Sequence, residues 1–571
     1  MSVETNTSNK RLTKQQLLDL DERLEQGIPK DLLSGIPRNV AVMNLLRYYE
    51  DQFRLYNPQL LQGEVVGLRE LIKQGQDSIH FAMWWIHRYC KNDASLSAIR
   101  RTDDAVYFLM KEIMDFALAY SGAWDYMGLL WRGSHSASFK DDNSVEISYF
   151  DKITEEFEIA DQLLNAPYPP NLLDSPRPDL DIRAFLDEAR PRRRGKGQVE
   201  YSFPNQQFEK IRAHFDKDSE PLWEMPPAWD IGGYTFAELR QFWTALTAWC
   251  SVHQLACYYS GVEGVGVDSL IERRPERQWI DELTMRSGLP FAKVKQIVTD
   301  LTYAPELYDR PKKPNPNVLQ QPFFRVARDE LALGNQLVLG SNADRNTWSL
   351  IGIIRQPIQD RLKNKKEDYW LEELRRKLSG RNIDVFGPFE FSVDGEPSDL
   401  DALIYDSASN SAMVTQLKWH VAPDRINEIA HTAEELNDGI RQALLAMKWI
   451  AKNPEELAAR IKIDVQRLKT CQMRPLVLSK NMMGKGRATN DAVPICSERL
   501  FDWIILDPHQ KSLEILWQVL VKRRFLPKLG KHYSEEDADF EFNGVQLIGK
   551  NMGLKLIGPW NPKDDIDFEG L

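Results

Sequence analysis

Three side chains in the C-terminal half of the chain have the types and spacing that chemistry on a phosphodiester requires: Asp401, Gln416 and Lys418. Asp401 opens one apolar run, and a second apolar run ends in Gln-Leu-Lys-Trp at 416–419, with a short polar stretch between the two runs. Such a pattern predicts a β-hairpin. Because residues two apart on a strand point to the same face, the amide and the lysine can converge on the acid at one end of a sheet.

These groups suit a metal-dependent hydrolysis. Mg²⁺ prefers oxygen ligands and is held by one or two carboxylates together with water and substrate phosphate. Asp401 supplies a carboxylate and Gln416 a carbonyl oxygen, so both are predicted ligands for Mg²⁺ or Mn²⁺. Lys418 can position or polarise the attacking water near the phosphate. The sequence therefore predicts that these three residues form the core of a catalytic site.

The pattern resembles the PD-(D/E)xK nuclease superfamily, whose core has an acid on one strand and (D/E/Q)xK on the next. Its Gln-Leu-Lys sequence is similar to the Mrr-like branch, in which the amide oxygen stands in for a carboxylate. The resemblance extends over roughly residues 340 to 510. It implies a metal-dependent DNA endonuclease, a hydrolase whose expected setting is bacterial restriction or anti-phage (antiviral) defence.

Two alternatives remain open. The glutamine lacks the negative charge that a carboxylate would provide to hold the ion. The first alternative is therefore a catalytically silent nucleic-acid-binding or assembly subunit with the same fold. The residues of the core motif would act on the phosphodiester group, which DNA and RNA share, and they do not distinguish the two sugars. An RNA nuclease is therefore the second alternative. Metal-dependent cutting and the choice of DNA or RNA substrate separate these possibilities.

A helix is predicted over 367–378, with an apolar stripe on one face and an end at Ser379-Gly380. Glu367 falls in line with that stripe. In the superfamily the helix before the first core strand often contributes an acid, so the resemblance implies that Glu367 is a further catalytic acid and metal ligand. The other interpretation is a first-turn glutamate that favours the helix dipole.

Further elements flank the predicted hairpin. An alternating strand is expected over 383–393, a long helix over 431–452 and another strand over 474–479. Superfamily nucleases often carry a glutamine or a basic residue on that long helix, which makes Gln442 a candidate for contact with nucleic acid. A solvent-facing residue is the alternative.

Two basic segments are candidates for binding nucleic acid. A Gly-rich loop holds Lys485 and Arg487, which could follow a phosphate backbone or serve only as solubilising surface. The segment 279–302 reads as helix, Ser-Gly-Leu turn and helix, similar to a helix-turn-helix, and would expose Lys293 and Lys295 to DNA. A plain corner between two packed helices is the competing interpretation.

The length of 571 residues and the periodicity predict a multidomain protein, with a mostly α-helical N-terminal half and an α/β restriction-endonuclease-like core in the C-terminal half. The predicted segments are a helical domain at 1–180, a second helical domain at 200–310, a connector at 311–340, the nuclease-like domain at 341–510 and an extension at 511–571.

Composition limits the class of protein further. A net charge of −11 does not exclude DNA as the partner, because local basic clusters decide binding. Other defence-system subunits or a second copy of the chain are further expected partners. No apolar run reaches about 18 residues and the first ten residues are polar, so we expect a cytoplasmic protein with no membrane contact. There is no GxxxxGK[ST] loop that would bind a nucleotide.

The five cysteines contain no CxxC pair, which argues against a zinc ribbon and against a disulfide framework. Cys250, His253 and Cys257 share a helical spacing that could supply three metal ligands. The aromatic residues around them favour core packing instead.

Overall fold

The computed structural model of the chain describes residues 12–60, 65–131, 133, 135–149, 152–164, 182–194, 198–218, 223–258, 266–308, 317–421, 426–483, 492–507 and 512–554. The chain divides into two compact units. Unit 1 contains Met1–Arg23, Ala123–Pro167 and Lys363–Leu571, and unit 2 contains Leu24–Gly122 and Tyr168–Leu362.

These units differ from the five continuous segments predicted from the sequence, because segments distant in sequence pair with each other. The last strand, β16 (Val545–Leu554), pairs in parallel with β2 (Ser144–Tyr149), although about 400 residues separate them. The predicted helical domain at 1–180 therefore contributes strands to unit 1. The predicted extension at 511–571 belongs to the same unit.

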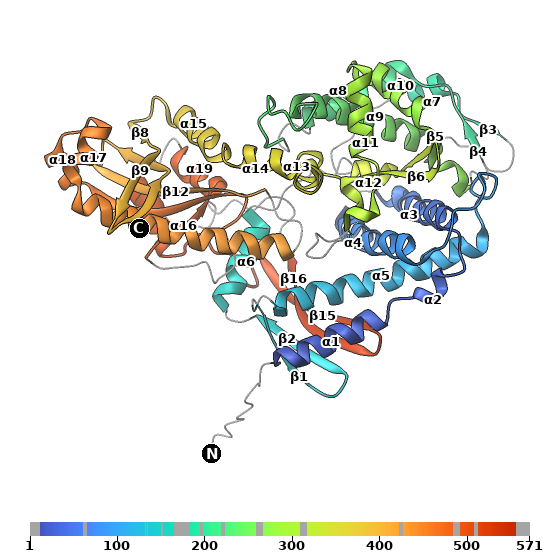
Figure 1. Cartoon of the computed structure of the whole chain (residues 1–571), viewed down its shortest axis with the longest axis horizontal. Helices are drawn as coiled ribbons and strands as arrows, with labels where there is room; N and C mark the ends of the chain where they lie inside the picture. The colour runs from blue at the N-terminus through green and yellow to red at the C-terminus, as the bar shows by residue number, and fades with distance from the viewer. Residues whose placement is uncertain are drawn as a thin grey trace. The chain divides into compact units, whose positions relative to one another are not determined.

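A mixed five-stranded sheet lies at the centre of unit 1 (Figure 1). Its order is β14 (Ile495–Ser497), β13 (Gln472–Lys480), β12 (Ser411–Trp419), β11 (Ala402–Asp406) and β8 (Ile383–Phe386). Strand β11 pairs antiparallel with β8 and with β12, whereas β13 pairs in parallel with β12 and with β14. All but one of the residues of β12 are buried, because helices and loops cover both faces of the middle of the sheet.

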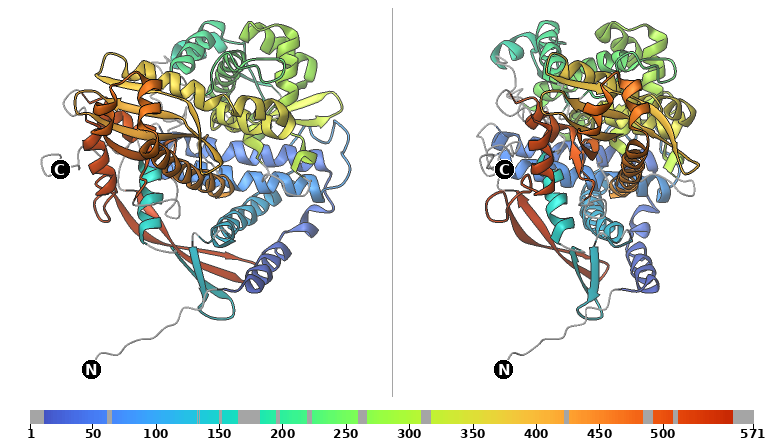
Figure 2. Two further views of the ribbon diagram at one scale, coloured as in Figure 1. Left: turned by 60° about the vertical axis from the view of Figure 1, so that its left-hand side comes forward. Right: turned by 90° about the vertical axis from the view of Figure 1, so that its left-hand side faces the viewer.

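Side chains on the two faces of the sheet belong to different hydrophobic clusters, because successive residues of a strand point to opposite faces. Leu417 and Ile404 pack in one cluster with α15 (Lys366–Leu378), whose predicted apolar stripe is buried. Val414 and Leu403 pack in the other cluster with Trp449 of α16 (Ile426–Lys452). Helix α16 packs along β12 and β13, and both views in Figure 2 show it beside the sheet. The face that carries Gln416 is therefore the face that α16 covers.

The predicted strand at 383–393 is two strands in different sheets. Strand β8 joins the central sheet, whereas β9 (Phe389–Val393) pairs with β10 (Glu396–Leu400) in a separate hairpin. Gly387 at the break has a φ of +121°, a conformation that glycine adopts without strain. The apolar run at 501–506 lies mostly in a helix, α19 (Glu498–Ile505), and not in a strand.

A second sheet of unit 1 has the order β1 (His135–Phe139), β2, β16 and β15 (Tyr533–Phe542). Figure 2 shows the β15–β16 hairpin in red beside β1 and β2. Helix α6 (Lys152–Leu164) follows β2 in the chain and packs into the same core as α15 and the central sheet. Residues far apart in sequence thus complete one core.

Unit 2 is mostly helical, as predicted for the N-terminal half. Helix α9 (Phe236–Tyr258) is buried along almost its whole length and packs against α8 (Asn205–Asp218), α10 (Glu276–Ser287) and α12 (Asn335–Leu339). Within the predicted connector at 311–340, the residues from 317 onward include β6 (Phe323–Ala327), β7 (Glu330–Leu333) and α12. Strands β6 and β7 form a three-stranded sheet with β5 (Glu272–Pro275), which provides hydrogen-bond partners for their backbone N–H and C=O groups.

The predicted helix-turn-helix segment forms α10 and α11 (Phe291–Asp300), joined by a turn with Gly288 in the left-handed region at φ +73°. The inner side of α11 is buried, as expected. His253 bonds to the Ser269 carbonyl at 2.8 Å and to the Tyr201 hydroxyl at 3.0 Å. It is buried together with Cys250 and Cys257, in agreement with core packing.

The remaining elements of the structure are α1 (Lys14–Gln26), α2 (Lys30–Leu33), α3 (Arg38–Leu60), α4 (Val65–Tyr89), α5 (Asp104–Trp131), α7 (Ile182–Ala189), β3 (Arg192–Arg194), β4 (Gln198–Glu200), η2 (Val267–Ser269), η3 (Pro305–Tyr308), η4 (Val318–Gln320), α13 (Ala343–Ile354), α14 (Gln356–Lys363), α17 (Pro454–Ile461), α18 (Val465–Lys469) and α20 (Leu513–Val521). Among the described residues, none of the helices combines the length and the apolar character that crossing a lipid bilayer requires.

Candidate active site

Asp401 lies where the chain passes from the β9–β10 hairpin into the central sheet. In the antiparallel pairing of β11 with β12, Ala402 is opposite Thr415, which brings Asp401 next to Gln416. The carboxylate of Asp401 accepts a hydrogen bond of 2.8 Å from the backbone N–H of Leu417 and is 9% exposed. The register of the two strands therefore brings the acid to the segment that carries the glutamine and the lysine.

Gln416 is fully buried, and its two amide atoms differ in their environment. Its Nε2 donates to the backbone carbonyl of Asp399 at 2.8 Å, which orients the side chain. Its Oε1 is buried and has no hydrogen-bond partner within the described part of the chain. A buried acceptor without a partner is costly, and a cation beside it would remove that cost.

A chain of hydrogen bonds connects Lys418 to an acid. The ammonium of Lys418 donates to Gln442 Oε1 at 3.0 Å, and Gln442 Nε2 donates to Asp399 Oδ1 at 3.2 Å. Gln442 on α16 therefore contacts both the lysine of β12 and the acid of β10. The chain holds the Lys418 side chain in one direction beside the carboxylates.

Gly439 lets α16 approach Lys418 closely. A Cβ atom at this position would lie 3.0 Å from Lys418 Cε and 3.3 Å from Val477 Cγ1. These separations are shorter than ordinary carbon contacts. A side chain at 439 would therefore press on the lysine.

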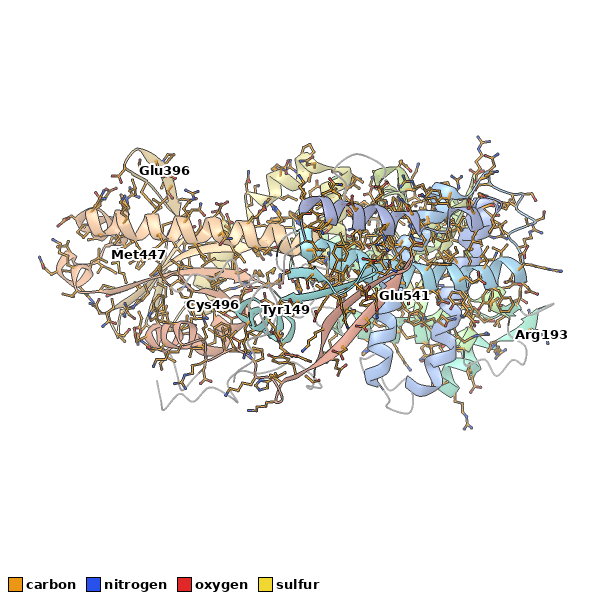
Figure 3. The ribbon with its side chains drawn as sticks, turned by 90° about the horizontal axis from the view of Figure 1, so that it is seen from below. Tyr149, Arg193, Glu396, Met447, Cys496 and Glu541 are labelled. Atoms are coloured by element: carbon orange, nitrogen blue, oxygen red, sulfur yellow. The ribbon has the colours of Figure 1, made fainter. Side chains whose placement is uncertain are left out.

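Ion pairs between charged side chains attach the β9–β10 hairpin to α16. Arg441 contacts Glu396 at 2.7 Å, and Asp394 receives Lys448 at 2.7 Å and Lys452 at 3.0 Å. Figure 3 labels Glu396 on the hairpin and Met447 on this helix. Because Asp399 lies at the far end of β10, these contacts also position the acid that Gln442 reaches.

Burial and like charges raise the proton affinity of the acids in the site. Burial, reinforced by the charge of Glu367 and opposed by Lys418, raises the pKa of Asp401 to about 7. Burial also raises the pKa of Glu367, where Lys418 acts in the opposite direction and Asp399 in the same one. The carboxylates are therefore near enough to repel one another, and added positive charge would favour their ionised forms.

The backbone of the turn after β8 packs against the backbone of Asp401. A Cβ atom at Gly387 would lie 2.5 Å from the Asp401 carbonyl oxygen, so the two backbones pack directly against each other. The guanidinium of Arg375 on α15 donates to the carbonyls of Val385 and Gly387 and holds this turn. Helix α15 thus positions Asp401 through the turn.

His420 follows Lys418 on the same face of the chain and pairs with Glu435 of α16. His420 Nδ1 lies 3.0 Å from Glu435 Oε2, and Lys363 donates to Glu435 Oε1 at 2.8 Å. Burial lowers the pKa of His420, and the hydrogen bond with Glu435 acts in the opposite direction. The hydrogen bond from His420 depresses the pKa of Glu435. Neither residue was among the site residues predicted from the sequence.

The structure brings Gln416, Lys418 and Gln442 into one hydrogen-bonded group around Asp399. Asp401, whose carboxylate bonds to the Leu417 N–H, and Glu367 are in electrostatic contact with this group. Asp399 was missed as a site residue. The signal was present, because Asp399 stands two residues before Asp401.

The other predicted nucleic-acid contacts do not belong to this group. Lys293 and Lys295 lie on α11 in unit 2, where Lys293 is paired with Glu238 and Lys295 is exposed. Lys485 and Arg487 lie outside the described residues.

The oxygen atoms of Asp401, Gln416 and the neighbouring acids are of the kind that Mg²⁺ and Mn²⁺ bind, and the unpaired Gln416 oxygen fits such an ion. In the part of the chain that the structure describes, no group of three or more His, Cys, Asp or Glu side chains is arranged to hold a metal. A ligand set here would therefore depend on the amide. Comparisons of this chain with protein-family models, with curated proteins and with solved structures find no match.

Proposed function

We propose that unit 1 is a metal-dependent nuclease of the PD-(D/E)xK type that cleaves DNA, in a setting of bacterial restriction or anti-phage defence. The observation that carries the proposal is the buried, unpaired amide oxygen of Gln416 beside Asp401, with Lys418 two residues along the same strand. The order of the helix and the central-sheet strands supports it, because the resemblance implies a helix followed by three strands. Helix α15 is followed in this sheet by β8, β11 and β12, with the β9–β10 hairpin inserted after β8.

The residues of the site have separate roles in this proposal. Asp401 and Gln416 would hold Mg²⁺ or Mn²⁺ through their oxygens, with Glu367 and Asp399 as nearby acids. A bound divalent ion supplies positive charge at the scissile phosphate and lowers the pKa of a coordinated water. Lys418, directed by Gln442, presents its ammonium to the phosphate or to the attacking water. Gln442 is a positioning residue, because it acts through Lys418.

One observation favours the silent alternative. The described residues offer no cluster of three acidic, histidine or cysteine ligands, so an ion would be held with fewer negative charges than three carboxylates provide. Under this alternative the chain binds nucleic acid or assembles with other subunits without cutting. An RNA nuclease is a further alternative that the same site chemistry allows.

The test is cleavage by the full chain. Supercoiled plasmid DNA and, in parallel, a structured RNA are incubated with Mg²⁺ or Mn²⁺ and the wild type, Asp401→Asn or Lys418→Ala protein. We expect nicked or linear DNA from the wild type and a loss of rate of about a hundredfold or more in each variant. Lys469→Ala is the matched control, because this lysine is exposed on α18 and pairs with Glu455, away from the site.

Cleavage of RNA in place of DNA would support the RNA nuclease. No cleavage of either substrate, or equal cleavage by wild type and Asp401→Asn, would overturn the proposal and favour the silent binding subunit.

A further inference from the structure

Unit 2 contains an open cavity of about 460 Å³ that is lined by segments from distant parts of its sequence. Arg38 comes from the start of α3, His87 from the last turn of α4 and Thr299 from the last turn of α11. Arg325 on β6 and Arg328 in the turn after it complete the polar side of the wall. No residue of the candidate active site contributes to this cavity.

The charged residues that line the cavity are mainly basic. Three arginines line it, against two acids, Asp93 and Glu306. Arg38 pairs with Asp93 at 2.8 Å, but both side chains are about 40% exposed, so solvent screens the pair. Arg325 also has an acidic partner, Glu276, which does not line the cavity, so Arg328 is the lining arginine whose charge no described acid pairs.

Two of these guanidinium groups come from one strand and its turn. Arg325 donates to the Arg328 carbonyl at 2.9 Å and to Glu276 at 2.9 Å, which orients the Arg325 side chain. The Arg328 side chain is exposed and makes no hydrogen bond or ion pair with any described residue. Arg328 is thus available to a ligand without the loss of an existing contact.

His87 adds a buried, neutral ring to the cavity wall. Both of its ring nitrogens are buried and lack a hydrogen-bond partner among the residues described. Burial, helped by the charge of Arg38, lowers the pKa of His87 to about 4, so the ring is neutral near pH 7. The ring therefore adds no positive charge to the wall.

We infer that this cavity binds a phosphate group. A guanidinium offers parallel N–H donors that match two phosphate oxygens, which makes arginine well suited to this anion. Thr299 lies one helical turn after the exposed Lys295, so the cavity adjoins the face of α11 that the sequence predicted to meet nucleic acid. The phosphate can come from a polynucleotide backbone or from a free phosphate. The inference does not rest on the proposed cleavage.

The test measures binding by the full chain that carries Asp401→Asn, in EDTA, so that cleavage cannot consume the probe. One arm titrates inorganic phosphate, and the other titrates a short single-stranded DNA oligonucleotide. We expect Arg328→Ala to weaken binding about tenfold, with Arg328→Lys in between because it keeps the charge but loses the planar fork. Lys111→Ala is the control, since this lysine is exposed on α5 and pairs with Asp115.

The two arms distinguish the sources of the phosphate. Tight binding of the oligonucleotide, with a salt slope that falls by about one in Arg328→Ala, identifies a backbone phosphate. Binding of inorganic phosphate alone identifies a small phosphate ligand. Binding of neither probe, or equal affinities in Arg328→Ala and Lys111→Ala, would overturn the inference whatever the outcome of the cleavage assay. Arg325→Ala is a second variant with the same expected loss.

Discussion

Asp401 is an acid that the fold keeps buried beside Glu367 and Asp399. Its pKa is raised from about 4 in an unfolded chain to about 7 in the folded protein. Between these values the folded state binds the proton and the unfolded state does not. The free energy of unfolding therefore falls as the pH rises from about 4 to about 7 and is level above, with a contribution on the order of 4 kcal/mol at most.

We predict that Asp401→Asn removes this pH-dependent loss. The variant should be more stable than the wild type at pH 8 without metal, and the two should converge near pH 4, in thermal unfolding followed across this range. Asp438→Asn is the control, because that side chain is 71% exposed. Parallel pH profiles for Asp401→Asn and the wild type would show that Asp401 titrates normally.

Gln416 gives a second prediction for a single residue. Gln416→Glu adds a buried negative charge and removes the donor to the Asp399 carbonyl, so we expect a lower unfolding temperature without metal. The added carboxylate should also increase the stabilisation that Mn²⁺ provides, because the ion then has another anionic ligand. Thermal unfolding with and without Mn²⁺ checks both effects. The exposed Gln466 supplies the control Gln466→Glu, and the same response from both variants would argue against a metal at Gln416.

At the scale of elements, α16 positions the lysine of β12. Its Gln442 bonds to Lys418, its Gly439 leaves space for the same side chain, and its Arg441 holds the β9–β10 hairpin. The helix therefore connects the two strand segments that supply the site.

We predict that Gly439→Ala separates stability from activity. Alanine favours a helix by about 1 kcal/mol over glycine, which offsets part of the crowding against Lys418 and Val477. We expect a small change in unfolding temperature and a clear drop in the cleavage rate, because Lys418 must move. Asn437→Ala, at an exposed position of the same helix, should leave the rate unchanged. An unchanged rate in Gly439→Ala would show that the position of Lys418 is not critical.

At the scale of the whole molecule, the core behind the central sheet includes a helix from the N-terminal third of the chain. Phe157 of α6 is 5% exposed and packs edge to face with Phe525, with ring centroids 5.8 Å apart. Met483 donates its backbone N–H to Asp161 at 2.6 Å, and Arg499 donates to the Leu164 carbonyl at 2.9 Å. The segment predicted as a nuclease-like domain, 341–510, therefore lacks part of its core.

We predict that Phe157→Ala destabilises unit 1 by about 3 to 5 kcal/mol, because it leaves a cavity in that core. Calorimetry of the full chain should show a lower transition temperature, together with loss of cleavage at temperatures where the wild type still cuts. Phe139→Ala on β1 is the control, since Phe139 is 41% exposed. Equal effects of the two substitutions would show that α6 is not part of the cooperative core.

Local patterns were enough to predict the two strands that carry the candidate site and the helix before them, but not the break of 383–393 into β8 and β9. Alternation along 402–405 and 414–419 indicated which side chains share a face, and the apolar period of 367–378 indicated the helix before them. Both patterns depend on the geometry of a few successive residues, which the chain carries without reference to the rest of the fold. The grouping of Asp401 with Gln416 and Lys418 follows from them.

Contacts between distant residues were decided only by the tertiary structure. The hydrogen bonds that Gln442 makes to Lys418 and Asp399 depend on how closely α16 approaches the sheet. The distance between the helix and the sheet cannot be predicted from a local sequence pattern. The pairing of β16 with β2 and the insertion of α6 into the core likewise join segments hundreds of residues apart. The sequence by itself thus determined the elements and the faces of the site, whereas long-range packing determined which acids meet and which segments form each unit.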